Sequence, residues 1–292
     1  LNPIKLASKN FLSSLDISCE EFLHILELAK NFKNNDLNIK LKEKVLGLIF
    51  DKSSTRTRVS FQVAMSRLGG TTVDLNPNTS QIGRGEPIRD TARVLSKYCD
   101  VLAIRTFHQA DLEEYAKWSS VPIVNALTDL EHPCQALADY LTIKETFSDL
   151  KNVILTFIGD GNNVANSLIL CGALLGVEVR IACPKGYEPD LRIINKAKQI
   201  YQNSDLLTIT EKIGENLNGL NFTFVGDGNN VATSLAKAIV MFGGNFIHSC
   251  PKGYEIPKKD LENINSLSKK YNGSFDIEND IDLSIKKSEI IL

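Results

Sequence analysis

The sequence contains the stretch Asp51-Lys52-Ser53-Ser54-Thr55-Arg56-Thr57-Arg58, which lies between two apolar segments of different periodicity. Residues 45–50 before it are continuously hydrophobic, as in a buried parallel strand, and residues 58–68 carry apolar side chains at roughly helical spacing. A strand, a polar turn and a helix in this order direct free backbone N–H groups and the positive end of a helix dipole toward an anion. The hydroxyls and guanidinium groups of the turn add donors. The stretch therefore predicts a phosphate or carboxylate site, although a capped helix followed by surface arginines is the simpler alternative.

Composition and charge are those of a soluble globular protein. The 292 residues are 43% hydrophobic and 23% charged, and this length is enough for two domains of ordinary size. The net charge of -2 gives no electrostatic reason to expect binding to nucleic acid or to an anionic membrane. No apolar run approaches the roughly 20 residues that span a bilayer, and the first residues do not show the n-region, h-region and cleavage site of a signal peptide.

The six cysteines are scattered without the C-x-x-C spacing of metal or redox sites. We expect them to be free thiols in a cytoplasmic protein. The sequence begins with Leu1 and ends with the apolar run Ile290-Ile291-Leu292, so we expect that it is not a complete natural chain.

The first half of the sequence alternates between strand-like and helical segments. Strands are expected over residues 45–50, 71–75, 101–104 and 122–125, and helices over 19–32, 58–68, 90–99 and 112–118. A further helix begins at His132-Pro133, with proline in the first helical position, and runs to about Phe147. This alternation predicts an α/β fold of two domains, each a mainly parallel sheet flanked by helices, over residues 1–147 and 148–292.

The second half contains a repeat. Gly159-Asp160-Gly161-Asn162-Asn163 recurs as Gly226-Asp227-Gly228-Asn229-Asn230, and the segment that starts at Cys183 recurs from Cys250, both at an offset of 67 residues (226 − 159 and 250 − 183). We therefore expect one βαβ segment to occur twice, over residues 152–218 and 219–285. Two copies indicate a duplication inside a domain, because a solenoid needs at least three repeats.

Each copy of the repeat places its glycine turn directly after an apolar strand and before a helix. In an open α/β sheet this is the carboxyl edge, where ligands bind. A dinucleotide-binding oxidoreductase is one alternative, but the third glycine of that fingerprint is absent after Gly161. The asparagines instead offer neutral donors and acceptors that suit the head group of an α-amino acid.

Two further positions carry polar side chains where predicted strands end or helices begin. Arg105 directly follows the strand over 101–104, and its alternative role is a surface ion pair. His132 and Gln135 are three residues apart, so they share one face of the first turn of their helix. There both side chains could donate to one carbonyl oxygen while the helix dipole stabilises developing negative charge; a capping histidine and a solvated glutamine are the structural alternative.

These motifs together resemble the aspartate/ornithine carbamoyltransferase family, and most closely its ornithine branch. The resemblance covers roughly residues 10 to 200. It rests on the Ser-Thr-Arg-Thr-Arg turn, the loop around Gln81 with the segment 90–95, Arg105-Thr106-Phe107, the segment 132–139 and the first Gly-Asp-Gly-Asn-Asn turn, in the family's order. An aspartate-specific member would carry a lysine in the loop that here holds Gln81.

The resemblance implies transfer of a carbamoyl group from carbamoyl phosphate to the δ-amine of L-ornithine, without a metal or an organic cofactor. The products are L-citrulline and phosphate, in a cytoplasmic enzyme of arginine biosynthesis that forms a homotrimer. It implies that Arg105, His132 and Thr57 are catalytic. The implied substrate-binding residues are Ser54, Thr55, Arg56, Thr57, Gln81 (from a neighbouring subunit), Arg105, His132, Gln135 and Asn163.

The sequence departs from the family after the first glycine turn. The family expects an Asp-x-Trp-x-Ser-Met-Gly loop and a later His-Cys-Leu-Pro segment, whereas the only tryptophan here is Trp118 and the second copy of the repeat follows instead. His248-Ser249-Cys250-Pro251 is better explained by the duplication. Three possibilities stay open: an enzyme with an altered ornithine half, a non-catalytic or impaired homologue that still binds carbamoyl phosphate, and an engineered or chimeric chain.

Only one of the two glycine turns can occupy the sheet position that faces the carbamoyl phosphate site. The first copy follows the interdomain helix at the family's distance, so we expect Asn163 to contact ornithine and Asn230 to be redundant. The strand over 222–225 should then fill the next position in the same sheet.

Overall fold

The computed structural model describes residues 4–34, 40–76, 80–147, 149–150, 153–183, 185–200, 217–287 and 290–291. By packing, the chain divides into two compact units. The first unit comprises Leu1–Val153, Asn162–Glu178 and Asp190–Gln202, and the second comprises Ile154–Gly161, Val179–Pro189 and Asn203–Leu292.

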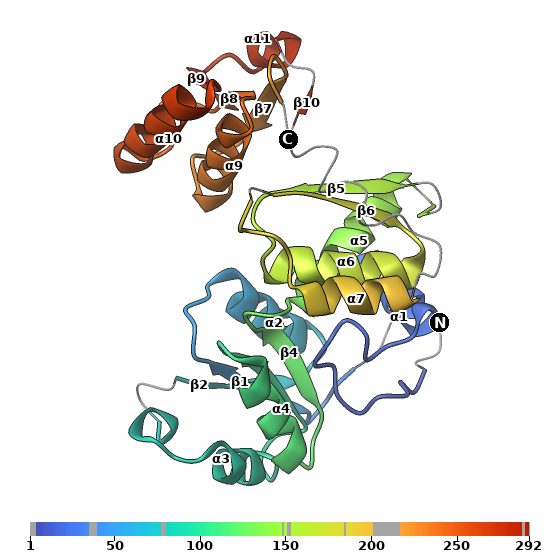
Figure 1. Cartoon of the computed structure of the whole chain (residues 1–292). Helices are drawn as coiled ribbons and strands as arrows, with labels where there is room; N and C mark the ends of the chain where they lie inside the picture. The colour runs from blue at the N-terminus through green and yellow to red at the C-terminus, as the bar shows by residue number, and fades with distance from the viewer. Residues whose placement is uncertain are drawn as a thin grey trace. The chain divides into compact units, whose positions relative to one another are not determined.

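The first unit is built on a four-stranded parallel sheet (Figure 1). Its strands are β1 (Val45–Phe50), β2 (Thr71–Leu75), β3 (Val101–Arg105) and β4 (Ile123–Leu127), in the order β2-β1-β3-β4. The central strands β1 and β3 are apolar along their length because helices cover both faces of the sheet. One core contains Ile49, Leu102 and Ile104, and the other contains Leu48 and Ala103.

Seven α-helices and one short 3₁₀ helix belong to the described part of this unit. They are α1 (Cys19–Lys33), α2 (Arg56–Arg67), η2 (Ile82–Arg84), α3 (Ile88–Leu95), α4 (Gln109–Trp118), α5 (Pro133–Phe147), α6 (Asn163–Leu175) and α7 (Leu191–Ile200). Helix α1 begins with a complete capping box between Ser18 and Glu21. Helix α6 packs against both α5 and α7, which places the helix of the first repeat copy in the first unit.

The second unit contains two sheets. One is two-stranded, from β5 (Ile154–Ile158) and β6 (Glu178–Ala182). The other has the order β10-β7-β8-β9, from β7 (Asn221–Val225), β8 (Asn245–Ser249), β9 (Ser274–Glu278) and β10 (Ile290–Ile291), and its helices are α9 (Asn230–Met241), α10 (Lys258–Tyr271) and α11 (Ile281–Lys286).

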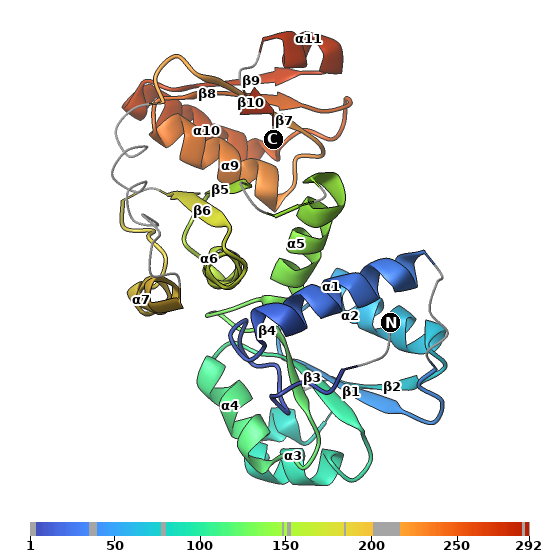
Figure 2. The same ribbon diagram turned by 90° about the vertical axis from the view of Figure 1, so that its right-hand side faces the viewer.

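The four-stranded sheet of the second unit is covered on both faces. Figure 2 shows α9 and α10 on one face and α11 on the other. Phe222 and Phe246 point into the apolar core beneath α9 and α10. On the opposite face the Ser284 hydroxyl of α11 donates to Ser249 Oγ at 2.9 Å, and Thr223 Oγ1 donates to the Ser284 carbonyl at 3.3 Å.

The predicted α/β class is confirmed, as are the strands over 45–50 and 71–75 and the helix that starts at Pro133. The predicted helix over 90–99 is displaced and spans Ile88–Leu95, after which the backbone turns: the N–H groups of Tyr98 and Cys99 both donate to the Leu95 carbonyl.

The expectation that residues 222–225 extend the sheet of the first copy is wrong for the described structure. Strand β7 pairs with β8 and β10 in a separate sheet because the second copy supplies its own neighbouring strands. The domain boundary at residue 147 stays a prediction. The packing units instead place α6 and α7 with the first half of the chain. Much of the segment between α7 and β7, and with it the end of the predicted first copy, lies outside the described residues, as do residues 77–79 and Leu292.

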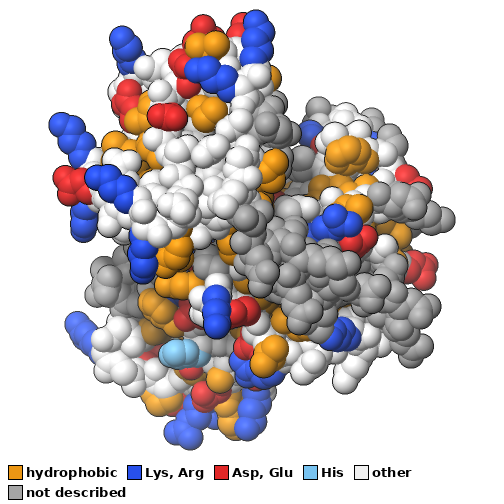
Figure 3. Space-filling model, turned by 45° about the horizontal axis from the view of Figure 1, so that its top comes forward, with side chains coloured by type: hydrophobic (Ala, Val, Ile, Leu, Met, Phe, Trp, Pro, Cys, Tyr) orange, Lys and Arg blue, Asp and Glu red, His pale blue; other side chains and the backbone are white. Residues whose placement is uncertain are grey.

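The surface mixes charges of both signs. In the face seen in Figure 3, Lys and Arg side chains are interspersed with Asp and Glu. Among the described residues, no helix is both long and apolar enough to cross a bilayer. All six cysteines are free thiols, and four of them are buried.

Candidate active site

The carboxyl ends of β1, β3 and β4 meet at one edge of the first sheet. Phe50 at the end of β1 pairs with Arg105 of β3, which in turn pairs with Leu127 of β4. Beyond the strands, the Asp51 N–H donates to the Arg105 carbonyl at 2.9 Å, and the Asp129 N–H donates to the Phe107 carbonyl at 2.8 Å. The turns that follow the three strands therefore lie side by side, which is where an open α/β sheet binds its ligand.

A polar cavity of about 300 Å³ opens at the end of β1. It is lined by Phe50, Asp51, Ser53, Ser54, Thr55, Arg58 and Asn76. Thr55 is the N-cap residue of α2, but its hydroxyl makes no capping hydrogen bond and the first turn of the helix contains no acidic residue. The positive end of α2 is therefore not neutralised by its own side chains, as expected of an anion site.

Two arginines of the predicted phosphate turn differ in position. Arg58 lines the cavity, packs with its guanidinium carbon 5.2 Å from the centre of the Phe50 ring and lies 3.4 Å (Nε to Oδ2) from Asp74. Arg56, which the sequence analysis selected, is exposed and is not among the residues that line this cavity. Thr57 is half-buried, and its carbonyl accepts from the Ser60 hydroxyl.

Arg105 and His132 are close enough to influence each other electrostatically. Burial and then the positive charge of Arg105 lower the pKa of His132 to about 4, so its imidazole is neutral at pH 7. Burial also lowers the pKa of Arg105. Nδ1 of His132 and Nε of Arg105 are buried and have no hydrogen-bond partner among the described residues. Buried polar atoms without a partner are rare in folded proteins, and a ligand at this edge could supply partners for these two.

A second contact links the three strand ends. Lys52, after β1, forms an ion pair with Asp129, after β4, and its ammonium lies 4.5 Å from the centre of the ring of Phe107, after β3. Asp51 lies beside this lysine in the sequence, and desolvation raises the pKa of its carboxyl. These contacts hold the turns around the cavity in one arrangement.

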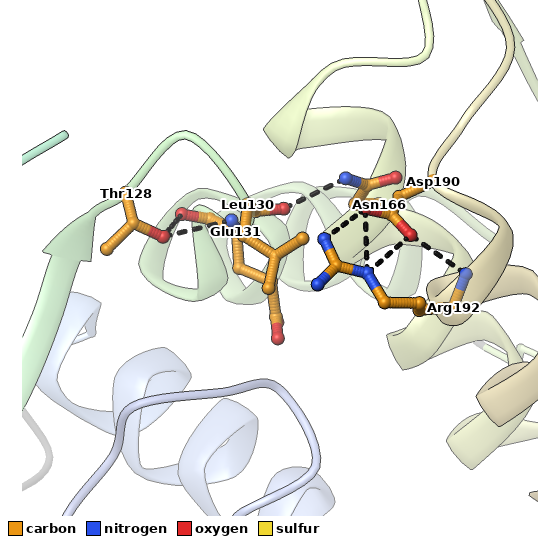
Figure 4. Close-up of polar contacts among 6 residues, drawn as sticks. All are labelled: Thr128, Leu130, Glu131, Asn166, Asp190 and Arg192. Atoms are coloured by element: carbon orange, nitrogen blue, oxygen red, sulfur yellow. Dashed lines mark hydrogen bonds and ion pairs between the residues drawn. The ribbon is translucent and has the colours of Figure 1, made fainter. Parts of the chain in front are cut away.

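The segment of residues 128–132 carries His132 from β4 to α5, and we call it the histidine loop. Figure 4 shows Thr128, Leu130 and Glu131 of this loop beside Asn166 of α6 and the pair Asp190–Arg192 at the start of α7. Asn166 Nδ2 donates to the Leu130 carbonyl at 2.9 Å. The Glu131 N–H donates to Thr128 Oγ1 at 3.1 Å, which closes the loop on itself.

Three further predicted residues lie at separate places. Gln135 is exposed, and its Nε2 donates to Asp139 Oδ1 at 2.9 Å, whereas His132 precedes α5 and is buried. Asn163 is half-buried, and its Nδ2 donates to the Thr128 carbonyl at 2.6 Å. Gln81 is exposed and is the N-cap residue of η2. The proposed location of Gln81 across a subunit interface stays a prediction.

The two glycine turns have nearly the same local structure. The Gly161 N–H donates to the Tyr187 carbonyl at 2.6 Å, and the Gly228 N–H donates to the Tyr254 carbonyl at the same distance. A Cβ atom at Gly161 would lie 2.1 Å from a backbone nitrogen, and one at Gly228 would lie 2.2 Å from its equivalent. Only glycine allows the backbone to approach this closely.

The described residues contain no group of three or more His, Cys, Asp or Glu side chains that could hold a metal ion. Of the residues that matter here, Asp51 and Arg58 were identified only as part of the polar turn, and Asn76, Asn166 and Ser167 were not selected. Asn166 and Ser167 follow Asn163 by three and four residues, so helical spacing after the first glycine turn was the signal that could have identified them.

Comparison with protein families assigns the fold and this site to one class. The family model described as "Aspartate/ornithine carbamoyltransferase, carbamoyl-P binding domain" matches residues 9–145. The model described as "Aspartate/ornithine carbamoyltransferase, Asp/Orn binding domain" matches twice, over residues 151–222 and 218–292. The chain belongs to the aspartate/ornithine carbamoyltransferase family.

Two relatives within that family are named ornithine carbamoyltransferase. A protein of Prochlorococcus marinus (strain MIT 9312) named ornithine carbamoyltransferase is 76% identical over 209 residues, which are 72% of this chain and 68% of that protein. The ornithine carbamoyltransferase of Nostoc punctiforme is 55% identical over 205 residues, 70% of this chain and 67% of its own length.

Solved structures agree with this assignment. Ornithine carbamoyltransferase from Pyrococcus furiosus is 36% identical with a TM-score of 0.69, and the alignment covers 91% of this chain and 96% of that one. The enzyme from Gloeobacter violaceus is also 36% identical, with a TM-score of 0.67 and coverage of 88% and 91%.

Proposed function

We propose that this chain transfers the carbamoyl group of carbamoyl phosphate to the δ-amine of L-ornithine. The observation that carries the proposal is the polar cavity at the end of β1. The same edge of the sheet carries Arg105 and the buried His132. A phosphate group and a polarised carbonyl have their complementary partners at this one edge.

The phosphate of carbamoyl phosphate binds at the start of α2. Ser54 and Thr55 line the cavity there, and the N–H groups of the first helical turn point out of the helix end. Arg56 and Thr57 add a guanidinium and a hydroxyl to the donors that bind the phosphate, and the Arg56 side chain is exposed. Arg58 contributes positive charge at the wall of the cavity, where Asp74 and Phe50 fix its guanidinium.

Arg105 and His132 polarise the carbamoyl carbonyl. The ornithine nitrogen forms a bond to the carbonyl carbon, and negative charge builds up on the oxygen. The bond to the phosphate oxygen then breaks, its electron pair leaves with phosphate, and the departing phosphate accepts the proton that the amine loses. The Arg105 guanidinium stabilises the charge on the oxygen, and a neutral His132 can donate a hydrogen bond to it. Gln135, whose Nε2 donates to Asp139 in this structure, turns to bind the carbamoyl group, and Thr57 is the third catalytic residue. Most of the acceleration comes from holding the amine against a polarised carbonyl.

Asn163 binds the α-amino-acid end of ornithine, and Gln81 of a neighbouring subunit closes the carbamoyl phosphate site in a homotrimer. The family membership supports both roles. The same membership supports a cytoplasmic enzyme of arginine biosynthesis that uses neither a metal nor an organic cofactor.

The test combines turnover with binding. Citrulline formation is measured with both substrates saturating, and carbamoyl phosphate is titrated alone by calorimetry. We expect both signals in the unsubstituted chain, loss of both in Arg105→Ala, and neither loss in Lys185→Ala, a residue remote in sequence from every proposed contact. Binding without citrulline would establish the impaired homologue instead. Absence of carbamoyl phosphate binding would overturn the proposal.

A further inference from the structure

Helix α6 holds the histidine loop through three side chains on one helix face. Asn163 Nδ2 donates to the Thr128 carbonyl at 2.6 Å, and Asn166 Nδ2 donates to the Leu130 carbonyl at 2.9 Å. Ser167 Oγ accepts from the His132 backbone N–H at 2.9 Å. Their spacing of three and four residues is that of neighbours on one face of a helix.

These contacts satisfy alternate backbone groups of a segment that has no regular structure of its own. The loop presents carbonyls at residues 128 and 130 and an N–H at 132, each of which would be costly to bury without a partner. Asn166 and Ser167 are themselves 3% and 0% exposed, so water does not easily replace their hydrogen bonds to the loop. Figure 4 shows Asn166 reaching from α6 to the loop.

Besides α6, two other segments of the first unit hold the loop. The Glu131 carboxylate, 2% exposed, accepts from the Ser13 hydroxyl at 2.6 Å and from the Ser14 N–H at 2.9 Å. Thr128 Oγ1 donates to Gln109 Oε1 of α4 at 2.8 Å. The loop is thus clamped between α6, α4 and the segment before α1.

We propose that Asn166 and Ser167 are positioning residues that place His132 by fixing the backbone of the histidine loop. This inference rests on the proposed function, in which His132 contacts the carbamoyl group. Both side chains bond to the backbone of the loop, so each acts on His132 through the loop.

The surroundings of the His132 imidazole explain why its loop needs these anchors. Nδ1 of His132 has no hydrogen-bond partner among the described residues, so no side-chain contact at that atom orients the ring. Its direction is then determined by the backbone that carries it and by the surrounding packing. A displacement of about 1 Å at a polarising group can cost on the order of a hundredfold in rate, which makes the loop anchors functionally important.

The second copy supplies a natural comparison. At the same offset of 67 residues, α9 carries Thr233 in place of Asn166 (233 − 166 = 67) and Ser234 in place of Ser167 (234 − 167 = 67). Thr233 has a side chain too short to reach a carbonyl as Asn166 does. The anchoring asparagine is therefore specific to the copy whose helix faces the histidine loop.

The experiment uses the full chain with two separate anchor variants, Asn166→Leu and Ser167→Ala. Ser167→Thr, which keeps a hydroxyl, is the rescue variant, and Ser234→Ala at the equivalent position of α9 is the matched control. The first measurement is the NMR titration of His132, assigned among the four histidines by its loss in His132→Gln. The second is the Kd of carbamoyl phosphate by calorimetry, and thermal unfolding is followed in parallel.

Both anchor variants should raise the pKa of His132 by about one unit, because a released loop lets water reach the imidazole. They should also weaken carbamoyl phosphate binding about tenfold, whereas Ser167→Thr and Ser234→Ala leave both values near those of the unsubstituted chain. Lower thermal stability with an unchanged His132 titration and unchanged Kd would overturn the inference. If the unsubstituted chain fails to bind carbamoyl phosphate, the proposed function falls, and the titration alone decides the positioning role.

Discussion

Two glycine turns of nearly identical sequence follow β5 and β7, and their backbones make the same contacts. Gly159 donates to the Ala182 carbonyl at 3.0 Å, and Gly226 donates to the Ser249 carbonyl at the same distance. The side chain of Asn162 caps α6 by accepting from the Ala165 N–H, and Asn229 accepts from the Ala232 N–H in the same way. Local structure is therefore repeated along with the sequence.

The helices that follow the two turns differ in what they contact. Helix α6 packs within the first unit and anchors the histidine loop, whereas α9 packs on its own four-stranded sheet. His248 of the second copy replaces Ile181 of the first (248 − 181 = 67), and its Nε2 lies 2.9 Å from the Gly226 carbonyl of its own turn. Equal motifs thus make different tertiary contacts according to their neighbours.

The largest expected difference between the copies is in the activity lost when Asn163 or Asn230 is replaced. Asn163→Ala should reduce ornithine-dependent citrulline formation by on the order of a hundredfold, since it removes both the proposed substrate contact and one anchor of the histidine loop. Asn230→Ala should change it less than about twofold. Steady-state kinetics on both variants decides this, and the reverse pattern would mean that the second copy has taken over the site.

Lowering the pH should destabilise the folded first unit through His132, which lies beside the helix of the first copy. Its pKa is about 4 in the folded chain against 6.5 when unperturbed, so the unfolded chain binds more protons between these pH values. The free energy of unfolding should consequently fall as the pH is lowered from 6.5 to 4, by about 3 kcal/mol in full. Urea unfolding of the chain and of His132→Gln across this range measures the effect. His248→Gln is the comparison, because a bond to Gly226 opposes the lowering of its pKa by burial. Equal pH dependence with and without His132 would contradict the prediction.

Phosphate recognition should depend on the first unit alone. Arg56→Ala should weaken carbamoyl phosphate binding by about 2 kcal/mol, ten- to a hundredfold, because a charge-assisted contact to the anion is lost. Arg58→Ala tests the arginine that the structure places in the cavity wall, and Lys252→Ala in the second copy is the control. Calorimetric titration gives the Kd values. Unchanged affinity in Arg56→Ala, or an equal loss in Lys252→Ala, would exclude the assignment of Arg56.

The smallest expected difference between the two copies is in the stability lost when Gly161 or Gly228 is replaced. Gly161→Ala and Gly228→Ala should each destabilise the second unit by about 1–3 kcal/mol, since each new Cβ would collide with backbone atoms. Similar losses in chemical unfolding would show that the two turns are equivalent by themselves. A much larger loss for one glycine would show that its turn is constrained by further contacts.

The sequence predicted the strands and helices of the first unit because their periodicities are strong. The apolar run 45–50 became β1, and the polar turn after it lines the cavity as expected. Pro133 correctly marked the start of α5. Arg105 and His132 were selected from their positions at a strand end and a helix start, and the structure brings the two groups within electrostatic range.

Other features could not be read from periodicity. Arg58 rather than Arg56 lines the cavity because the helical rotation at the start of α2 determines which side chain faces it. The strand over 222–225 pairs with β8 and β10, since a duplicated segment brings its own strand neighbours. The anchors Asn166 and Ser167 depend on a loop that is more than thirty residues away in the sequence.

By itself, the sequence determined the family, the class of fold and the strand–turn–helix form of the two repeated glycine turns, because these follow from spacing, backbone freedom and motif order. Only the tertiary structure decided which sheet the second copy joins and which polar atoms near the histidine loop are buried without a partner. The physical reason is that hydrogen bonding and desolvation depend on which distant segments meet, and two nearly identical segments met different neighbours.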